Sequence, residues 1–600
     1  MDNIYAARIE SLRELMRSRG WDAVVLTGSD PHGSEYPAER YKQVRWLTGF
    51  TGEAGDVVVT ADHAGLWTDT RYFIQANRQL AGTGVELHKT RIPEQVLIPE
   101  WMAGHFAEED SLVIAVDGLC MAASAVEALV EPLRKARVDF FVDSVPDLLS
   151  ELWTDRPQIP QTPIFTVDSG ESRVERMDWL RGWAEEKGYD AVFLSSLDEV
   201  AWMLNVRASD IEYNPLVISY LLITGTDARW FVLKDEVEDP DTEAVFAELS
   251  GDGIDILPYN GVEDAFSELG RCRLFVDDET LNHHLRHALG QSQVKPVAGV
   301  SPVGLRKACK NPVEIEGMRE AHLRDGVAME KFLYWLEKSV QADRIVTEWD
   351  AAVKLGRLRS EIPGYRGDSF ETISAYGPGA ALPHYITPKT NAPCLEAHGL
   401  YLCDSGGQYS YGTTDITRTV PLGDCTPLER EDYTLVLKGH IDLAMAVFPE
   451  GTPGCRIDAL SREPLWRARR NFGHGTGHGV GYFLGVHEGP QDIRQNMNPQ
   501  PLMTGMITSD EPGIYREHMH GVRHENLILA VEDESNDFGK WMRFETLTLC
   551  HFDTSAVEVE LLDRAEIEWL NDYNRRVYET LAPLLPEDIA AWLKVKTAQI

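Results

Sequence analysis

The sequence predicts a mixed α/β and α+β protein, with two related α/β domains followed by a third domain of different character. A length of 600 residues is too great for one compact core, so two to four domains of roughly 100–200 residues are expected. A helix-to-strand opening occurs twice, because Gly20-Trp-Asp-Ala-Val-Val-Leu26 is similar to Gly188-Tyr-Asp-Ala-Val-Phe-Leu194. Such self-similarity indicates a duplicated domain. The later half of the chain instead places acidic residues and histidines among short strands and glycine-rich turns.

The first domain is predicted from an amphipathic helix followed by a buried strand. Apolar residues recur at helical spacing in the helix, and a continuous apolar run forms the strand. Prolines and polar residues at 153–160 suit a linker, so this domain is assigned to residues 1–157. Its predicted helices are 9–20, 72–80 and 122–135, and its predicted strands are 23–27, 56–60, 65–69 and 112–116.

The second domain, assigned to residues 158–305, repeats the opening with a helix at 173–187 and a strand at 191–195. The third domain is assigned to residues 306–600. Its predicted helices are a long one at 312–338 and a C-terminal helical extension at 566–581 and 586–593.

Composition excludes several classes of protein. The 43% hydrophobic and 26% charged residues are typical of a globular protein rather than a disordered or fibrous one. A formal net charge of -39 opposes binding to nucleic acid and to anionic membranes. No apolar run approaches the roughly 18 residues of a membrane span, and no secretion signal is visible, so a cytoplasmic protein is expected. The 8 cysteines are scattered and are expected to be reduced thiols.

Two pairs of acidic residues occupy equivalent places in strand-turn-strand segments. Asp404 follows an apolar run and Asp415 opens the next one, which predicts a hairpin or near-hairpin with one carboxylate on each strand. Glu511 and Glu525 repeat this arrangement. Buried carboxylates lose hydration worth many kcal/mol unless positive charge neutralises them. Two bound cations would neutralise these four.

One histidine completes the set. It comes from the run Phe-Gly-His-Gly-Thr-Gly-His-Gly-Val-Gly at 472–481, whose glycines disfavour the helical His-Glu-x-x-His arrangement of zinc peptidases. Oxygen-rich ligation with one imidazole suits manganese or cobalt better than structural zinc. Each residue alone is typical of a solvated turn, but together they form a pattern that chance seldom builds. The predicted ligands of a two-ion hydrolytic site are Asp404, Asp415, His478, Glu511 and Glu525.

At these residues the chain resembles the pita-bread metallopeptidases, specifically the long, three-domain form of Xaa-Pro aminopeptidase. Similar motifs extend over nearly the whole chain. The resemblance implies two creatinase-type α/β domains followed by a pita-bread catalytic domain. The motifs are His32-Gly-Ser-Glu-Tyr36, Trp67-Thr-Asp-Thr-Arg-Tyr-Phe73, Asp198-Glu-Val-Ala-Trp-Met-Leu-Asn205, Pro383-His-Tyr385, Asp404-Ser-Gly-Gly-Gln-Tyr409, Gly412-Thr-Thr-Asp-Ile-Thr-Arg-Thr419, His474-Gly-Thr-Gly-His-Gly-Val-Gly-Tyr482, Val486-His-Glu-Gly-Pro490, Glu511-Pro-Gly513 and Val522-Arg-His-Glu-Asn526.

The resemblance also implies a chemistry. The five ligands would bind two divalent ions, Mn²⁺ by preference with Co²⁺ or Zn²⁺ as alternatives, and a water between the ions would attack the peptide bond. Glu511 would take the proton from that water and return it to the proline nitrogen. The substrates would be peptides with proline at the second position, and the enzyme would release their first residue. A homodimer is implied as well.

Further residues match the family's substrate-binding positions. His384, His474 and His487 match cleft histidines that hold the scissile carbonyl and the proline ring. Arg523 and Tyr515 match their supporting residues. In the long family members charged residues of the first domain approach the cleft, which makes Glu35 and Arg71 candidates.

Three positions depart from the family pattern, and three alternative functions stay open. The family usually has an acidic residue in place of Tyr411, asparagine in place of Asp510 and an aliphatic residue in place of His524. Asp510 could raise the pKa of the neighbouring Glu511, and His524 adds a titratable group beside Glu525. The alternatives are a prolidase that cuts only dipeptides, a catalytically inactive peptide-binding pita-bread protein and a metal-free creatinase-like hydrolase.

Overall fold

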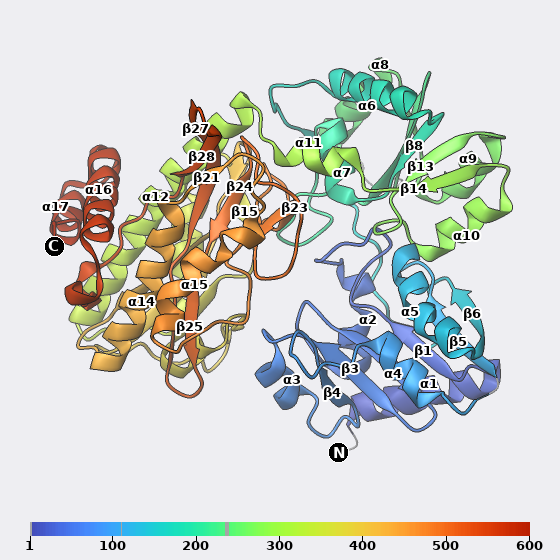
Figure 1. Cartoon of the computed structure of the whole chain (residues 1–600), viewed down its shortest axis with the longest axis horizontal. Helices are drawn as coiled ribbons and strands as arrows, with labels where there is room; N and C mark the ends of the chain where they lie inside the picture. The colour runs from blue at the N-terminus through green and yellow to red at the C-terminus, as the bar shows by residue number, and fades with distance from the viewer. Residues whose placement is uncertain (1–2, 110, 234–238) are drawn as a thin grey trace. The chain divides into compact units, whose positions relative to one another are not determined.

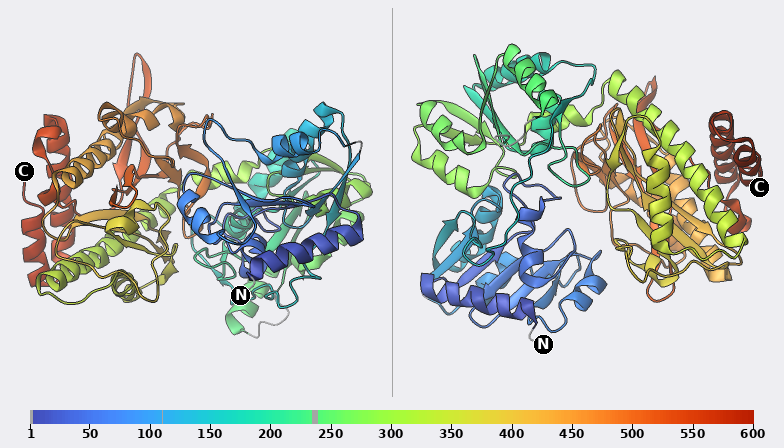
Figure 2. Two further views of the ribbon diagram at one scale, coloured as in Figure 1. Left: turned by 90° about the horizontal axis from the view of Figure 1, so that it is seen from below. Right: turned by 180° about the vertical axis from the view of Figure 1, so that it is seen from behind.

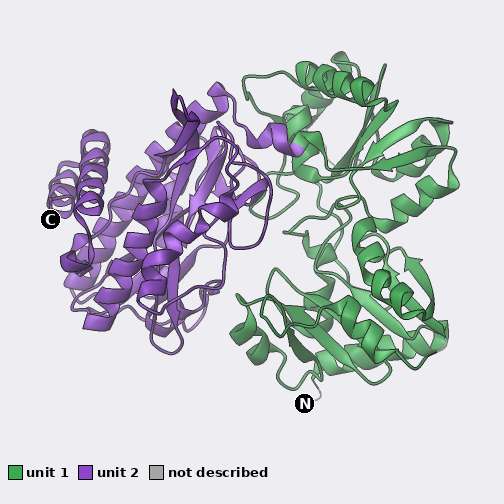
Figure 3. Ribbon diagram, in the orientation of Figure 1, with its two compact units in different colours: residues 1–303 green, residues 304–600 purple. Residues whose placement is uncertain are grey.

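The computed structural model describes residues 3–109, 111–233 and 239–600. The chain divides into two compact units, Met1–Val303 and Gly304–Ile600 (Figure 3). In the described part of the chain, every helix is too short or too polar to span a lipid bilayer.

Unit 1 begins with a sheet of six strands in the order β4-β3-β2-β1-β5-β6 (Figure 1). The central strand β1 runs antiparallel to β2 and parallel to β5. Helix α1 lies along one face of this sheet (Figure 2). The strands are β1 Ala23–Leu26, β2 Asp56–Thr60, β3 Ala64–Thr68, β4 Glu86–Lys89, β5 Ser111–Asp117 and β6 Asp139–Val145, and the helices are α1 Ile4–Arg19, α2 Gln43–Thr48, α3 Phe73–Gln79, α4 Ile98–His105 and α5 Ala123–Ala136.

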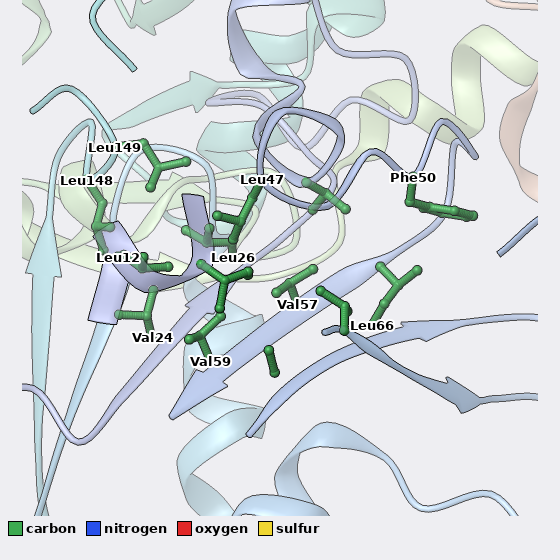
Figure 4. Packing of buried hydrophobic residues seen from close by; sticks show 14 of the residues in the cluster. Leu12, Val24, Leu26, Leu47, Phe50, Val57, Val59, Leu66, Leu148 and Leu149 are labelled. Carbon is green, nitrogen blue, oxygen red and sulfur yellow. The ribbon is translucent and has the colours of Figure 1, made fainter. Parts of the chain in front are cut away.

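Alternation along the strands divides the core of this sheet between its two faces. Val24 and Leu26 pack with Leu12 of α1 on one face, as Figure 4 shows. Val25 and Val58 pack on the other face with residues of α4 and α5. Both faces are covered, which explains why β1 and β2 are almost continuously apolar.

A second sheet in unit 1 repeats this topology, with the order β12-β11-β10-β8-β13-β14. Its central strand β8 again has one antiparallel neighbour, β10, and one parallel neighbour, β13. The prediction of two related α/β domains is therefore confirmed. The strands are β8 Ala191–Leu194, β10 Ser219–Thr224, β11 Ala228–Val232, β12 Ile254–Pro258, β13 Arg273–Val276 and β14 Lys295–Ala298, with the small pair β7 Phe165–Thr166 and β9 Val206–Arg207; the helices are α6 Arg173–Lys187, α7 Leu197–Leu204, α8 Pro240–Gly251, α9 Val262–Glu268 and α10 His283–Gln291.

Unit 2 consists of antiparallel strands flanked by long helices. It has three sheets, with the orders β15-β18-β19, β16-β17-β20 and β21-β28-β27-β24-β22-β23, and β25 pairs with β26. The last two of these sheets carry or flank the predicted metal ligands. The strands are β15 Tyr365–Asp368, β16 Ile373–Tyr376, β17 Leu400–Ser405, β18 Gly407–Tyr409, β19 Gly412–Thr413, β20 Ile416–Pro421, β21 Val447–Pro449, β22 Gly477–Gly479, β23 Glu488–Ile493, β24 Ile507–Asp510, β25 Gly513–Arg516, β26 His520–Arg523, β27 Asn526–Asn536 and β28 Gly539–Thr546.

The helices of unit 2 follow from capping signals and from apolar periodicity. Asn311 accepts hydrogen bonds from the backbone of Val313 and Glu314, and Pro312 occupies the first turn of α12, as expected for a helix start. Helix α11 Pro302–Ala308 precedes it at the unit boundary. The other helices are α12 Pro312–Gln341, α13 Glu348–Ser360, α14 Pro427–Ala444, α15 Asp458–Arg467, α16 Arg564–Leu581 and α17 Glu587–Lys596.

Most predicted elements are present, but several ends differ. Helix α1 begins at Ile4 rather than at residue 9, because the side chain of Asn3 caps its first turn. Helix α12 continues to Gln341, three residues beyond its predicted end. The predicted domain boundaries at 157 and 305 stay predictions.

Candidate metal centre

Asp404 and Asp415 are brought together by a pair of antiparallel strands. Asp404 lies on β17 and pairs with Thr417 of β20. Asp415 lies one residue before β20, and not on the strand as predicted. The connection is also longer than a simple hairpin, because it contains β18 and β19, which join a different sheet. The near-hairpin prediction thus holds for the strands, and Asp415 lies in the short connection that directly precedes β20.

His478, Glu511 and Glu525 come from neighbouring strands of the six-stranded sheet. His478 is the middle residue of β22, Glu511 follows β24 and Glu525 precedes β27. Strand β24 pairs with both β22 and β27. The close approach of these strands requires a glycine at position 477, because a Cβ there would meet the backbone oxygen of Ser509 at 1.9 Å. The glycine-rich run therefore serves strand packing, in agreement with the prediction that this histidine is not on a helix.

The five predicted ligands lie in one cluster. Asp415, His478 and Glu525 each offer a ligand atom within 4.8 Å of the others. Nε2 of His478 lies 3.4 Å from Oδ2 of Asp415 and 3.6 Å from Oε1 of Glu511. Asp404 is close enough to Asp415 for the two carboxylates to interact electrostatically. Asp404, Asp415 and Glu525 are buried, whereas His478 and Glu511 are half-buried.

The orientation of His478 suits a ligand. Its Nδ1 lies 2.9 Å from the backbone oxygen of Gly479 and donates a hydrogen bond to it. The proton is therefore held on Nδ1, and the lone pair of Nε2 faces the carboxylates. Ligating histidines are commonly oriented in this way by a bond from the other ring nitrogen.

The positively charged side chains near the cluster do not neutralise its four carboxylates. Burial raises the pKa of Asp404. Arg523 lowers this pKa, and Asp415 raises it further. Burial and the carboxylates of Asp415, Asp404 and Glu511 raise the pKa of Glu525 well above its usual range. Burial also raises the pKa of Glu511 to about 7, against the effects of His478 and Arg523.

One carboxylate oxygen directly indicates a cation site. Oδ1 of Asp404 is buried and has no hydrogen-bond partner in the described structure. A buried oxygen without a partner is costly, and a divalent cation would satisfy it. Oxygen donors with one imidazole nitrogen fit divalent ions of the manganese, cobalt and zinc group. The residues therefore fit a divalent metal.

Several hydrogen-bonding residues that hold these ligands were not predicted. Thr417 donates to Oε2 of Glu525 at 2.8 Å. Ser509 accepts from the backbone nitrogen of His478 at 3.0 Å and lies 3.3 Å from Oε1 of Glu511. Arg418 donates to the backbone oxygen of Glu525 at 2.6 Å. A serine or threonine beside a ligand in sequence carries no distinctive signal, so only the fold identifies these residues.

The predicted supporting residues form a chain of hydrogen bonds beside the ligands. Nη1 of Arg523 donates to the hydroxyl of Tyr515 at 2.8 Å, and that hydroxyl lies 2.7 Å from Nε2 of His474. Nδ1 of His474 donates to the backbone of Gly475, so its Nε2 accepts from Tyr515. Burial and Arg523 lower the pKa of His474 well below its usual range. His474 is therefore neutral.

The other two predicted cleft histidines also lie at this site. The rings of His487 and His478 are 4.3 Å apart. His384 follows Pro383, whose backbone oxygen accepts a hydrogen bond from Arg523 at 3.5 Å. Both histidines are half-buried, which leaves their rings accessible to a ligand.

Glu35 and Arg71, the two predicted substrate-binding candidates of the first domain, belong to unit 1. Arg71 makes a two-pronged ion pair with Asp69, at 2.9 Å and 2.8 Å. Burial lowers the pKa of Arg71, whereas Asp69, Tyr72 and, more weakly, Glu35 raise it.

At the three departures from the family pattern, the side chains contact residues that are not predicted ligands. Tyr411 donates to the backbone oxygen of Pro363 at 2.7 Å. Oδ2 of Asp510 lies 3.1 Å from Nδ1 of His440. The ring of His524 packs against Tyr433, and burial lowers its pKa well below its usual range. His524 is therefore neutral and adds no charge beside Glu525.

Family models match almost the whole chain. The model of metallopeptidase family M24 matches residues 316–532, and the C-terminal region of peptidase M24 matches residues 540–600. Two models of the creatinase/prolidase N-terminal domain match residues 8–145 and 155–314. Each of the two six-stranded sheets of unit 1 lies in one of these last two matches.

Full-length relatives and a solved structure agree with these matches. The chain is 36% identical to a probable Xaa-Pro aminopeptidase P from Laccaria bicolor, over 98% of this chain and 92% of that protein. It is 37% identical to aminopeptidase P2 from Arabidopsis thaliana, over 96% of this chain and 86% of that protein. The crystal structure of X-prolyl aminopeptidase from Caenorhabditis elegans, described as a cytosolic enzyme with a di-nuclear active site, has a TM-score of 0.93 and 34% identity, and the match covers 100% of both chains. The chain therefore belongs to the Xaa-Pro aminopeptidase P family of M24 metallopeptidases, and its fold is that of two creatinase-type domains followed by a pita-bread domain.

Proposed function

We propose that this protein is a metal-dependent aminopeptidase that hydrolyses the first peptide bond of peptides whose second residue is proline. The observation that carries the proposal is the cluster of four carboxylates and His478, in a chain related over its full length to Xaa-Pro aminopeptidases. The C. elegans protein, which is similar over the full chain, is described as having a di-nuclear active site. Two divalent ions are therefore proposed here.

The proposed ligands are Asp404, Asp415, His478, Glu511 and Glu525, and Mn²⁺ is the proposed metal, with Co²⁺ and Zn²⁺ as alternatives. Such ions lower the pKa of a bound water and polarise the carbonyl that it attacks. Burial of Asp404, Asp415 and Glu525, together with the fixed tautomer of His478, keeps these donors in place before any metal binds.

Glu511 is the proposed general base. It is half-buried in the cluster, with Oε1 3.6 Å from Nε2 of His478 and 3.3 Å from the hydroxyl of Ser509, and a carboxylate positioned beside the attacking water can act as its general base. Glu511 takes the proton from the attacking water. It then gives the proton to the proline nitrogen, which must be protonated to leave as an amine.

The proposed substrate-binding residues surround this carboxylate. His384 and His487 donate hydrogen bonds toward the scissile carbonyl, where one donor to the developing oxyanion is worth about 3 kcal/mol. His474 is neutral and is held by Tyr515 and Arg523, so its ring offers the proline ring an uncharged face. Glu35 and Arg71 stay candidates for substrate binding on the strength of the sequence resemblance.

Three rival functions are less well supported. A prolidase would need to recognise the free carboxylate of a dipeptide. The Xaa-Pro dipeptidase from Bacillus anthracis matches over only 63% of this chain at 24% identity, which shows a shared fold. Neither an inactive peptide-binding protein nor a metal-free hydrolase requires a cluster of carboxylates that includes a buried oxygen without a hydrogen-bond partner.

A peptide panel tests the proposal. Purified enzyme is assayed with Mn²⁺, Co²⁺ or Zn²⁺ on tripeptides of the form Xaa-Pro-Yaa and Xaa-Ala-Yaa and on Gly-Pro. Release of the first residue from the proline tripeptides alone is expected. Equal cleavage of the alanine series would refute proline specificity, and cleavage of Gly-Pro alone would identify a prolidase.

The cellular setting is proposed on similar grounds. A cytoplasmic location is proposed because the C. elegans relative is described as a cytosolic enzyme, and cell fractionation tests it. A homodimer is proposed from the family resemblance. Sedimentation velocity at several protein concentrations tests that assembly.

A further inference from the structure

Two histidines and a glutamate form a second cluster of potential metal ligands, in unit 1. His63, Glu86 and His88 each offer a ligand atom within 4.8 Å of the others. Nε2 of His63 lies 3.1 Å from Nε2 of His88, and Nδ1 of His63 lies 3.9 Å from a carboxylate oxygen of Glu86. The proposed catalytic residues of unit 2 do not include any of these three.

The three side chains are placed on one face of the first sheet by its register. Strand β4 pairs in parallel with β3, so that Glu86 lies opposite Gly65 and His88 lies opposite Trp67. Glu86 and His88 are two residues apart on β4 and therefore project to the same side. His63 lies in the tight turn before β3, where its backbone nitrogen donates to Thr60.

Both imidazole rings are held by aromatic neighbours. His88 stacks on Trp67, with ring centres 3.8 Å apart and an interplanar angle of 7°. The ring of His63 lies 4.7 Å from that of Trp101. Trp67 is itself anchored, because its Nε1 donates to the backbone oxygen of Val96 at 2.9 Å. The two rings are thus positioned by packing, as a preorganised site requires.

Gly65 is an independent observation in favour of a site, because a side chain at this position would collide with the two imidazole rings. It lies inside β3 with no unusual backbone conformation, where glycine normally weakens a strand. A Cβ at this position would meet Nε2 of His63 at 2.6 Å and Cδ2 of His88 at 2.8 Å. The absence of a side chain at 65 therefore allows the two imidazoles to converge.

We propose that His63, His88 and Glu86 bind a divalent transition-metal ion of the zinc class, separate from the catalytic metals. Two nitrogens bound to zinc at 2.0–2.1 Å in a tetrahedral site lie about 3.3 Å apart, close to the separation of the two Nε2 atoms. Two imidazoles and one carboxylate form a common three-ligand zinc set, in which water supplies the fourth ligand. Glu86 is exposed and can swing toward the ion.

The electrostatics of the rings agree with this role. A ligating imidazole must be neutral, and burial lowers the pKa of both His63 and His88, although the Glu86 carboxylate opposes this effect. A bound ion would tie the turn before β3 to β4, the edge strand of the sheet. Its function would be to stabilise this edge.

The number of metal ions per chain tests the proposal without relying on activity. Native holoenzyme and variants are dialysed against low micromolar zinc, and total manganese plus zinc is measured by plasma mass spectrometry. Because the two metals are summed, replacement of manganese by zinc at the catalytic centre does not change the measured number of ions per chain. His88→Ala should bind one ion fewer than the native protein, and the matched control His287→Ala, at an exposed histidine on α10, should bind the native number.

A second variant guards against misfolding. Glu86→Gln changes only an exposed side chain and leaves the aromatic packing intact. It should weaken zinc binding at this site by at least about 10–100-fold, the range that loss of a residue which merely orients a ligand costs. It should also reduce the rise in unfolding temperature that zinc produces in the native protein. Equal metal content and equal zinc-dependent stabilisation in native protein, His88→Ala and Glu86→Gln would overturn the proposal.

Discussion

The guanidinium of Arg523 donates a hydrogen bond to Oδ2 of Asp404, across 119 positions of sequence. The same side chain donates to Thr417 through Nε at 3.1 Å and to Tyr515 through Nη1 at 2.8 Å. Arg523 thereby links the carboxylate cluster to the residues proposed to bind substrate.

Arg523→Lys is expected to lower both metal affinity and turnover, by about 10–100-fold. Lysine carries the same charge, but its compact ammonium cannot span the four acceptors that the planar guanidinium of Arg523 contacts. Activity measured as a function of Mn²⁺ concentration should show a higher half-saturating concentration. The control Arg467→Lys, at an exposed ion pair with Glu463, should behave like the native enzyme, and native metal affinity in Arg523→Lys would contradict this role.

Thr417→Val removes a hydroxyl while preserving shape. It should cost about tenfold in activity, because Oε2 of Glu525 loses its donor and Arg523 loses an acceptor. Thr417→Ser retains the hydroxyl and should restore most of the activity. If serine fails to rescue, packing rather than hydrogen bonding explains the loss.

Glu511→Gln tests the proposed general base. Glutamine has nearly the same shape but cannot accept the proton, so kcat should fall by at least about 10²–10⁴-fold, with a smaller change in KM. Steady-state kinetics on one Xaa-Pro tripeptide at saturating Mn²⁺ separate the two constants. Glu517→Gln, at an exposed position on the same segment, is the control, and a kcat within a few-fold of native in Glu511→Gln would rule out the base role.

Removal of metal should abolish activity and also destabilise unit 2. The four carboxylates repel one another without cations, and each ion at a concentration one hundred times its Kd contributes about 2.7 kcal/mol to stability. Thermal unfolding after dialysis against a chelator should therefore occur at a lower temperature. Stepwise addition of Mn²⁺ should restore both unfolding temperature and activity, whereas an unchanged unfolding temperature would show that no cation neutralises the cluster.

Asp442 on α14 should make stability depend on pH. Burial and the nearby Glu566 raise the pKa of Asp442 to about 7, partly offset by Lys438. The folded state therefore keeps a proton that the unfolded chain loses near pH 4, so this residue makes the protein less stable as pH rises from about 4 to 7. Asp442→Asn should flatten that dependence.

At pH 8 the Asp442→Asn holoenzyme is expected to be more stable than the native one, by about 1–2 kcal/mol once solvent screening of this partly exposed group is allowed for. At pH 4 the two should be nearly equal. Denaturant unfolding at both pH values measures the difference. Asp572→Asn, at an exposed surface ion pair with Arg575, is the control, and a pH-independent difference for Asp442→Asn would contradict the assignment.

Local sequence patterns predicted much of the secondary structure. Helix α6 and strand β2 have the predicted bounds, because apolar periodicity and the flanking glycine or polar residues leave few alternatives. The start of α1 was placed too late, since the cap at Asn3 precedes the apolar pattern. The longer connection between β17 and β20 was also missed, because the pairing of β18 with β15 depends on residues about 40 positions upstream.

The sequence by itself determined the repeated α/β domains, the family and the identity of the candidate ligands, since these depend on motifs and periodicities read along the chain. Only the tertiary structure decided which side chains meet. Nothing in the sequence marks Thr417, Ser509, His63 or His88 as functional. In the structure, the two hydroxyls bond to predicted ligands and the two histidines lie side by side. Their roles arise from strand register and packing, because hydrogen bonds and metal coordination depend on distances of a few Å between residues that the chain brings together only when it folds.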